Sequence, residues 1–158
     1  MQIITGNLLD SSETYLCHQC NCVSNRSAHL AEAVFKKFPW ADIYSKRTYP
    51  WTPPEKEQLG DIIICGNDKN RLVINMLAQY YPGRSRFPHS KTDGILVRQD
   101  AFKSCLIKIA KSAEPDESIA FPWGIGCGAA GGDWGVYLKM IQDFDNKVQN
   151  EIRLYKLE

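Results

Sequence analysis

The sequence lacks a strong excess of charge of either sign. Lys and Arg total 19 against 18 for Asp and Glu in 158 residues, which leaves a formal net charge of +1. A nearly neutral chain gives no electrostatic reason to bind nucleic acid or a membrane surface. No nucleic-acid-binding patch is evident in the sequence and we expect no membrane partner; the expected partner is a small molecule, with a modified macromolecule as the alternative.

Long apolar runs are also missing. The opening residues MQIITGNLLD have no basic leader followed by an apolar segment, and no stretch approaches the roughly 18 apolar residues that cross a bilayer. No internal repeat, low-complexity tract or long polar linker divides the chain. We expect one soluble domain, residues 1–158, in the cytoplasm, with the nucleus as the alternative location.

Cysteine is present, but the patterns that would give it a function are absent. Three of the six cysteines lie in LCHQCNC, residues 16–22, and no second Cys-x-x-Cys exists. If this segment is a strand, Cys17 lies on the opposite face from Cys20 and Cys22, which does not suit a closed zinc site. We expect reduced, buried thiols, no metal and no cofactor. His18 is expected to be a core histidine with one hydrogen bond.

The order of apolar segments indicates an α/β fold. Short β-branched segments alternate with longer segments in which apolar residues recur at helical spacing. The expected strands are 2–5, 15–21, 61–65, 72–78, 118–122 and 151–155. The expected helices are 28–38, 96–112 and 134–146. Two proline-containing segments, 49–57 and 80–91, are expected to be connections.

The most informative segment is IAFPWGIGCGAAGGDWG, residues 119–135. Five glycines lie within nine residues, between a short apolar run and an expected helix. Glycine permits positive φ and close backbone approach, so successive N–H groups can converge on an anion. A tight strand-to-helix turn is the alternative, but the density of glycines favours anion binding. No Gly-Lys-Ser/Thr follows, so this is not a P-loop.

Two polar residues flank the expected crevice. Asp133 has two open interpretations: it is the N-cap of the following helix, or its carboxylate holds a sugar hydroxyl, takes a proton or orients a water beside a bound phosphate. Asn21 ends the strand 15–21, where an amide at the carboxyl end of a strand can contact a ribose or a base.

Taken together, these segments resemble a macrodomain, the ADP-ribose-binding module. The resemblance is to the branch that includes ADP-ribose 1''-phosphate phosphatases and the terminal ADP-ribose protein hydrolase. The matching stretches, in the order of the family, are TGNLLD, HQCNC, AVFKKFPWADIYSKR, LGDI, INMLAQYYPGR and FPWGIGCGAAGGDW. The resemblance implies a three-layer α/β/α fold with a central mixed sheet and a ligand crevice at one end.

The resemblance also implies ligand contacts, residue by residue. Asn7, followed by Leu8, would meet the adenine edge, and Asn21 would approach the distal ribose. Asp133 matches the aspartate of a Gly-Asp-Trp signature, and Arg84 is a candidate support for phosphate. The loop expected to wrap the diphosphate and distal ribose supplies Gly124, Ile125, Gly126, Cys127, Gly128, Ala129, Ala130 and Gly131.

The sequence departs from the family in its first loop. Relatives follow the strand-end Asn-Cys with QGxMGxGIA, and an ungapped count places those three glycines on Ser24, Ser27 and His29. Ser24 and Ser27 become candidate ligand contacts, and His29 a candidate acid or base. The alternatives are an ordinary exposed helix residue at His29 and weakened ADP-ribose binding.

A second departure concerns the mechanism. The lysine nucleophile of the terminal hydrolase falls on Gln79 and its aspartate partner on Ala130, which disfavours a lysine adduct. The leading hypothesis is a hydrolase of a small ADP-ribose derivative that removes the 1''-phosphate by water attack. Asp133 would activate the water, Asn21 would position the ribose, and His29 would carry a proton. The alternatives are a binding module without turnover and removal of ADP-ribose from a modified macromolecule.

Overall fold

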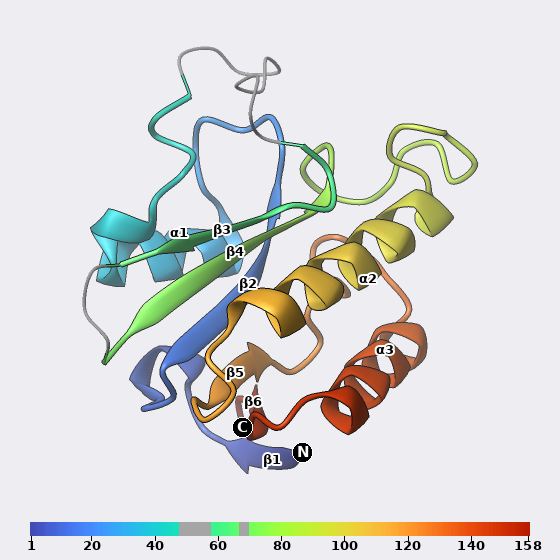
Figure 1. The fold of residues 1–158 in the computed structure, drawn as a ribbon. Coiled ribbons are helices and arrows are strands. Elements are labelled where there is room, and N and C mark those ends of the chain that lie inside the picture. Colours follow the sequence, from blue (N-terminus) through green and yellow to red (C-terminus); the bar gives the residue numbers. More distant parts are fainter. Residues whose placement is uncertain (48–57, 67–69) are drawn as a thin grey trace.

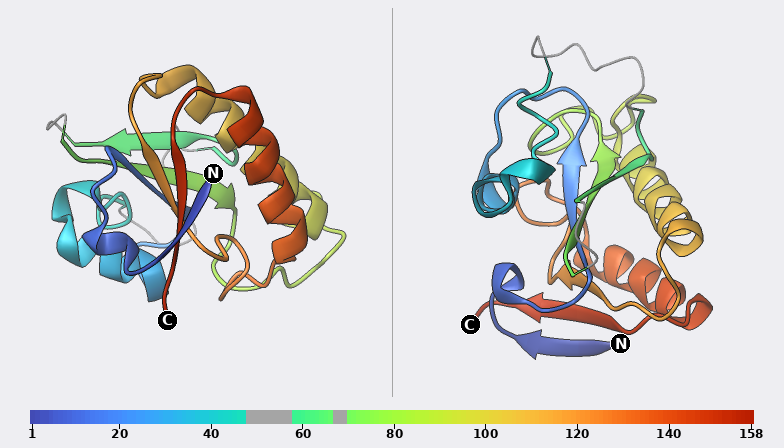
Figure 2. Two further views of the ribbon diagram at one scale, coloured as in Figure 1. Left: turned by 90° about the horizontal axis from the view of Figure 1, so that it is seen from below. Right: turned by 60° about the vertical axis from the view of Figure 1, so that its left-hand side comes forward.

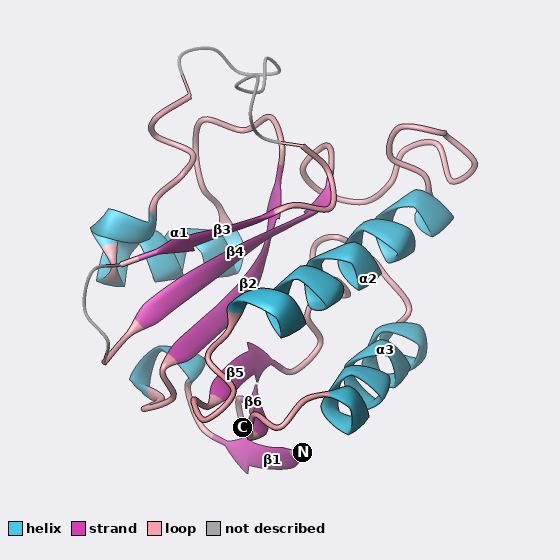
Figure 3. Cartoon of the chain, in the orientation of Figure 1, coloured by secondary structure: helices cyan, strands magenta, loops and turns pink. Residues whose placement is uncertain are grey.

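A six-stranded mixed sheet forms the centre of the protein (Figures 1 and 3). The computed structural model describes residues 1–47, 58–66 and 70–158, so the expected connection 49–57 lies outside the described residues. The strands are β1 (Gln2–Thr5), β2 (Tyr15–Asn21), β3 (Ile62–Cys65), β4 (Leu72–Gln79), β5 (Ile119–Pro122) and β6 (Ile152–Lys156). Each begins and ends within one residue of its expected bounds.

The sheet has the strand order β1-β6-β5-β2-β4-β3. All neighbouring strands are parallel except β3, which pairs with β4 in the antiparallel sense. Because β2 lies between β4 and β5, the connection from β4 to β5 crosses over β2. Ligands of open α/β sheets bind at such points, beyond the carboxyl ends of the parallel strands.

Helices cover both faces of the sheet (Figure 2). The helix α1 (His29–Lys37) lies on one face together with the short 3-10 helices η1 (Leu8–Asp10) and η2 (Pro39–Ala41). The helices α2 (Ile95–Ser112) and α3 (Trp134–Lys147) cover the other face. The predicted α/β/α fold class is therefore confirmed. No helix in the described parts of the chain is long and apolar enough to cross a membrane.

The alternation predicted for the strand 15–21 is confirmed. Cys17 packs in the core beneath α2 and α3, whereas Cys20 and Cys22 pack in the second core beneath α1. All six cysteines are free thiols, and these three are buried. Burial raises the pKa of the Cys17 and Cys20 thiols, so both stay protonated and act as small apolar residues.

His18 is a core histidine, as expected. It is fully buried, its Nε2 lies 2.6 Å from Asn75 Oδ1, and its ring meets Phe35 edge to face with 5.3 Å between centroids. Burial lowers the pKa of His18 to about 4, although the hydrogen bond to Asn75 acts in the opposite direction. The folded protein therefore holds a neutral imidazole at this position.

This neutral imidazole should make the fold sensitive to mild acid. Between pH 6.5 and pH 4 the unfolded chain binds a proton on His18 that the folded chain does not, so stability falls as the pH is lowered. The cost from this residue is roughly 1.4 kcal/mol per pH unit in that window. Urea unfolding at several pH values gives the free energy of unfolding as a function of pH. Between pH 6.5 and pH 4 this free energy should fall less steeply for His18→Gln than for the wild type, and equal slopes would contradict this account.

Candidate functional site

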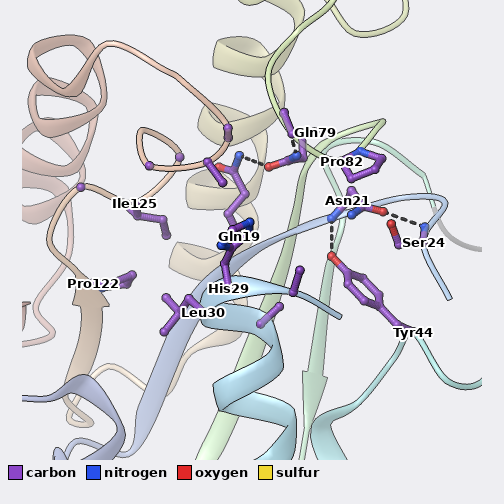
Figure 4. A pocket seen from close by; sticks show the side chains of 18 of the residues that line it. Gln19, Asn21, Ser24, His29, Leu30, Tyr44, Gln79, Pro82, Pro122 and Ile125 are labelled. Atoms are coloured by element: carbon purple, nitrogen blue, oxygen red, sulfur yellow. Dashed lines mark hydrogen bonds between the residues drawn. The ribbon is translucent and has the colours of Figure 1, made fainter. Parts of the chain in front are cut away.

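A cleft of about 340 Å³ opens at the carboxyl ends of β2, β4 and β5 (Figure 4). Parallel strands end at the same edge of a sheet, so Asn21, Gln79 and Pro122 all line it. Other residues come from the loop before α1 and from the glycine loop after β5. The sequence-predicted residues that line the cleft are Asn21, Ser24, His29, Gln79, Gly124, Ile125, Gly126, Gly128, Ala129 and Ala130.

Seven predicted site residues are not among the described residues that line the cleft. Asn7 caps η1, where its Oδ1 accepts a hydrogen bond of 3.0 Å from the Leu9 N–H. Leu8 is buried beneath α1, and Arg84 packs its aliphatic chain beside Gly131. The remaining residues of the seven are Ser27, Cys127, Gly131 and Asp133.

Asn21 is held in a fixed orientation at the end of β2. Its Oδ1 accepts hydrogen bonds from the Val23 N–H at 3.0 Å and the Ser24 N–H at 2.8 Å, and its own N–H donates to the Tyr44 hydroxyl at 2.7 Å. Arg47 donates to the carbonyl oxygens of Asn21 and Ser24, both at 2.9 Å. Because Oδ1 is already used twice, Nδ2 is the atom that Asn21 can offer to a ligand.

His29 lines the cleft and has a backbone conformation that is unusual for a residue other than glycine. It is the first residue of α1 and its φ is +56°, in the left-handed region that favours glycine. The sequence resemblance puts a family glycine at this position, and the φ of His29 is one that glycine adopts more easily than histidine. Non-glycine residues in this region are enriched where the backbone serves a function.

The glycine loop forms the opposite wall of the cleft. Gly124 and Gly126 both have φ of +78°, and Gly131 has φ of +75°. A Cβ on Gly126 would lie 2.7 Å from the Tyr137 ring and 2.9 Å from Gln19 Oε1, so no larger residue fits at this position. The close approach and the positive φ agree with the predicted backbone wall.

Asp133 is the N-cap of α3, one of its two predicted roles. Its Oδ1 accepts a hydrogen bond of 3.0 Å from the Gly135 N–H, and the side chain is exposed. Burial raises the pKa of the nearby Cys127 thiol to about 11, and the negative charge of Asp133 adds to this shift as the smaller cause. The catalytic role of Asp133 stays a prediction.

Gln79 belongs to a chain of amides on the cleft floor. Its Nε2 donates to the Tyr81 carbonyl at 2.8 Å, so its Oε1 accepts from Gln19 Nε2, also at 2.8 Å. The sequence analysis did not select Gln19, although strand alternation places it on the same face as Asn21. That shared face was a signal that could have identified it.

A buried ion pair joins the loop after β4 to the glycine loop, two of the segments that border the cleft. Arg98 of α2 meets Asp93 through two hydrogen bonds, of 2.9 Å from Nε and 2.6 Å from Nη2. The same guanidinium donates to the carbonyls of Tyr81 at 3.1 Å, Gly83 at 2.7 Å and Ala130 at 3.3 Å. One side chain therefore fixes the loop after β4 and the glycine loop together. Sequence analysis missed Arg98, Arg47 and Tyr44.

The described residues that line the cleft include basic side chains but no acidic one. The ionisable side chains that line it are Arg26, His29 and Tyr44, and none of the described lining residues is Asp or Glu. A site with cationic and neutral groups and no carboxylate is suited to an anionic ligand. Arg26 was not predicted from the sequence either, because in this loop only the three positions that carry glycine in the family pattern were considered.

Comparisons with known proteins identify the fold. Neither a protein-family model nor a curated protein matches the sequence. The macrodomain of Thermus aquaticus DarG superposes with a TM-score of 0.68 and 20% identity, over 99% of this chain and 97% of that one. The macrodomain of Mycobacterium tuberculosis DarG gives 0.66 and 19%, over 98% and 95%. The Trypanosoma brucei macrodomain in complex with ADP-ribose gives 0.59 and 13%, over 98% and 62%. The protein has the macrodomain fold.

Removing Arg98 should destabilise the whole protein. Arg98→Met leaves the carboxylate of Asp93 buried without its partner, which costs about 3–5 kcal/mol in comparable pairs. The exposed i,i+4 pair of Lys139 and Asp143, 2.7 Å apart, supplies a control. Urea unfolding should show the large loss for Arg98→Met and less than about 0.5 kcal/mol for Lys139→Met. Similar small losses for both variants would show that the buried pair does not support the fold.

Glycine at position 29 should relieve the strained backbone. His29→Gly and His29→Ala both remove the imidazole, but only glycine adopts φ of +56° without steric cost. We expect His29→Gly to be more stable than His29→Ala by about 1 kcal/mol in urea unfolding. If alanine is as stable as glycine, residue 29 does not keep the left-handed conformation in solution.

Proposed function

We propose that this protein binds an ADP-ribose derivative in the cleft and hydrolyses it, with removal of the 1''-phosphate of ADP-ribose as the reaction. The observation that carries this proposal is the cleft itself, which is walled by a glycine backbone with positive φ and lined by no described carboxylate. The Trypanosoma brucei structure of the same fold holds ADP-ribose. Because one fold can serve many functions, the assignment depends on this site and not on the fold alone.

The residues suggest how such a ligand would lie. The N–H groups of Ile125, Cys127 and Gly131 already donate to carbonyls of the same segment. The diphosphate would therefore be bound by the other N–H groups of the loop, those of Gly124, Gly126, Gly128, Ala129 and Ala130, which a glycine-rich backbone lets an anion approach closely. Asn21 Nδ2 would donate to a hydroxyl of the distal ribose. From the sequence resemblance, adenine would lie near Asn7 and Leu8, which are outside the lining of the cleft, and Arg84 would add positive charge beside Gly131.

The proposed reaction is direct attack of water on the phosphorus. The water oxygen forms a bond to phosphorus, the bond from phosphorus to the ribose oxygen breaks, and the products are ADP-ribose and inorganic phosphate. A base must take a proton from the water, and the ribose oxygen must gain one. Asp133 and His29 are the proposed groups; His29 lines the cleft, whereas Asp133 is outside its lining. Gln79 and Ala130 cannot form the lysine adduct of the terminal hydrolase.

A binding module without turnover is the second candidate. Its support is the same absence of a carboxylate among the described lining residues, because a water-activating base is harder to find there. Such a module would bind ADP-ribose through the glycine loop and Asn21 and would release no phosphate.

Calorimetry and a phosphate-release assay separate the two candidates. We expect the wild type to bind ADP-ribose and to release phosphate from ADP-ribose 1''-phosphate. Asp133→Asn removes the carboxylate but keeps a preferred N-cap residue, so its fold should be intact while release falls about 100-fold or more. Binding without any release would overturn the phosphatase proposal. Release that is unchanged in Asp133→Asn would exclude Asp133 and leave His29 as the base to test.

A further inference from the structure

Arginines near the cleft are of two kinds. Arg47 and Arg98 are buried, and their guanidinium groups donate to backbone carbonyls that shape the walls. Arg26 is exposed, lines the cleft, and makes no hydrogen bond or ion pair with any residue in the described part of the chain. Its five N–H donors are therefore available to a ligand.

The loop that carries Arg26 is anchored at both ends. At its start, Ser24 donates its N–H to Asn21 Oδ1 at 2.8 Å and accepts from Arg47 at 2.9 Å. At its end, His29 begins α1 with φ of +56°. Figure 4 shows Asn21, Ser24 and His29 around the cleft. Because the loop is held at both ends, its backbone stays in place and keeps the Arg26 side chain beside the cleft.

The same count that places three family glycines on Ser24, Ser27 and His29 places Arg26 on the methionine of that motif. A cation and an imidazole thus occupy a loop that the family pattern builds from glycine and an apolar residue. Glu32, the nearest acidic residue along the chain, is exposed and is not among the described residues that line the cleft. The loop therefore brings positive charge to the cleft, and no carboxylate among the described lining residues neutralises it.

We propose that Arg26 determines specificity for a ligand whose distal ribose carries a phosphomonoester. This inference rests on the proposed ADP-ribose site. Asn21, which would contact the distal ribose, begins the loop that carries Arg26, so a group on that ribose lies next to the loop. A phosphomonoester bears close to two negative charges at neutral pH, and guanidinium binds it through two parallel hydrogen bonds. A free ribose hydroxyl gains much less from the same contact.

Competition for a fluorescent ADP-ribose conjugate tests this proposal. Anisotropy is read within the first seconds after mixing with ADP-ribose or ADP-ribose 1''-phosphate, before appreciable phosphate release. We expect the wild type to prefer the 1''-phosphate by at least about tenfold. Arg26→Ala should abolish the preference and change the affinity for ADP-ribose by less than about twofold. Arg26→Lys should retain part of it, as a point charge without the planar fork.

Arg86→Ala is the matched control, because Arg86 is an exposed arginine outside the lining of the cleft. It should leave both affinities unchanged. Equal wild-type affinities, or a preference that survives Arg26→Ala, would overturn the role of Arg26. Equal weakening of both ligands would place Arg26 on the diphosphate and would also overturn it. If the wild type does not bind the conjugate, the proposed ADP-ribose site itself is wrong and this inference falls with it.

Discussion

The geometry of the cleft depends on the buried ion pair between Arg98 and Asp93. Removing a guanidinium and a carboxylate from water is costly, and the cost is offset only if nearly every donor and acceptor finds a partner. Here Asp93 also accepts a hydrogen bond of 2.8 Å from the Tyr80 N–H, and Arg98 reaches three carbonyls. Because those carbonyls belong to the loop after β4 and to the glycine loop, satisfying the pair also fixes these two segments relative to each other.

Arg47 performs the same task on the first loop. Its guanidinium stacks 4.7 Å from the Tyr44 ring centroid and donates to the carbonyls of Asn21 and Ser24. Two buried arginines thus position the backbone around the cleft, and neither is among the described residues that line it. A buried guanidinium must donate its hydrogen bonds to groups of the protein. An exposed guanidinium such as that of Arg26 still has N–H donors for a ligand.

Sequence reasoning located the elements well because their patterns are local. Alternation of side chains defined β2 and separated Cys17 from Cys20, and helical spacing ending before Pro39 defined α1. The contacts of Arg98 could not be predicted from the sequence. Two of its acceptors, the carbonyls of Gly83 and Ala130, are far apart in the chain and are brought together only by the fold. The segments predicted to form the site do border one cleft, whereas the side chains that hold these segments were not predicted; that the cleft binds the predicted ligand stays a prediction.

The two loops beside the cleft use different chemistry for the same space. In the proposed function, the glycine loop would donate to a phosphate with those backbone N–H groups that do not already donate to nearby carbonyls, as the N–H groups of Ile125, Cys127 and Gly131 do. The first loop has a left-handed residue at His29 and borders the cleft with side chains such as Arg26, which can discriminate between ligands by charge and length. If the proposed function holds, backbone contacts would give affinity for the part that all ADP-ribose derivatives share, and selection among derivatives would fall to the first loop, which borders the cleft with side chains.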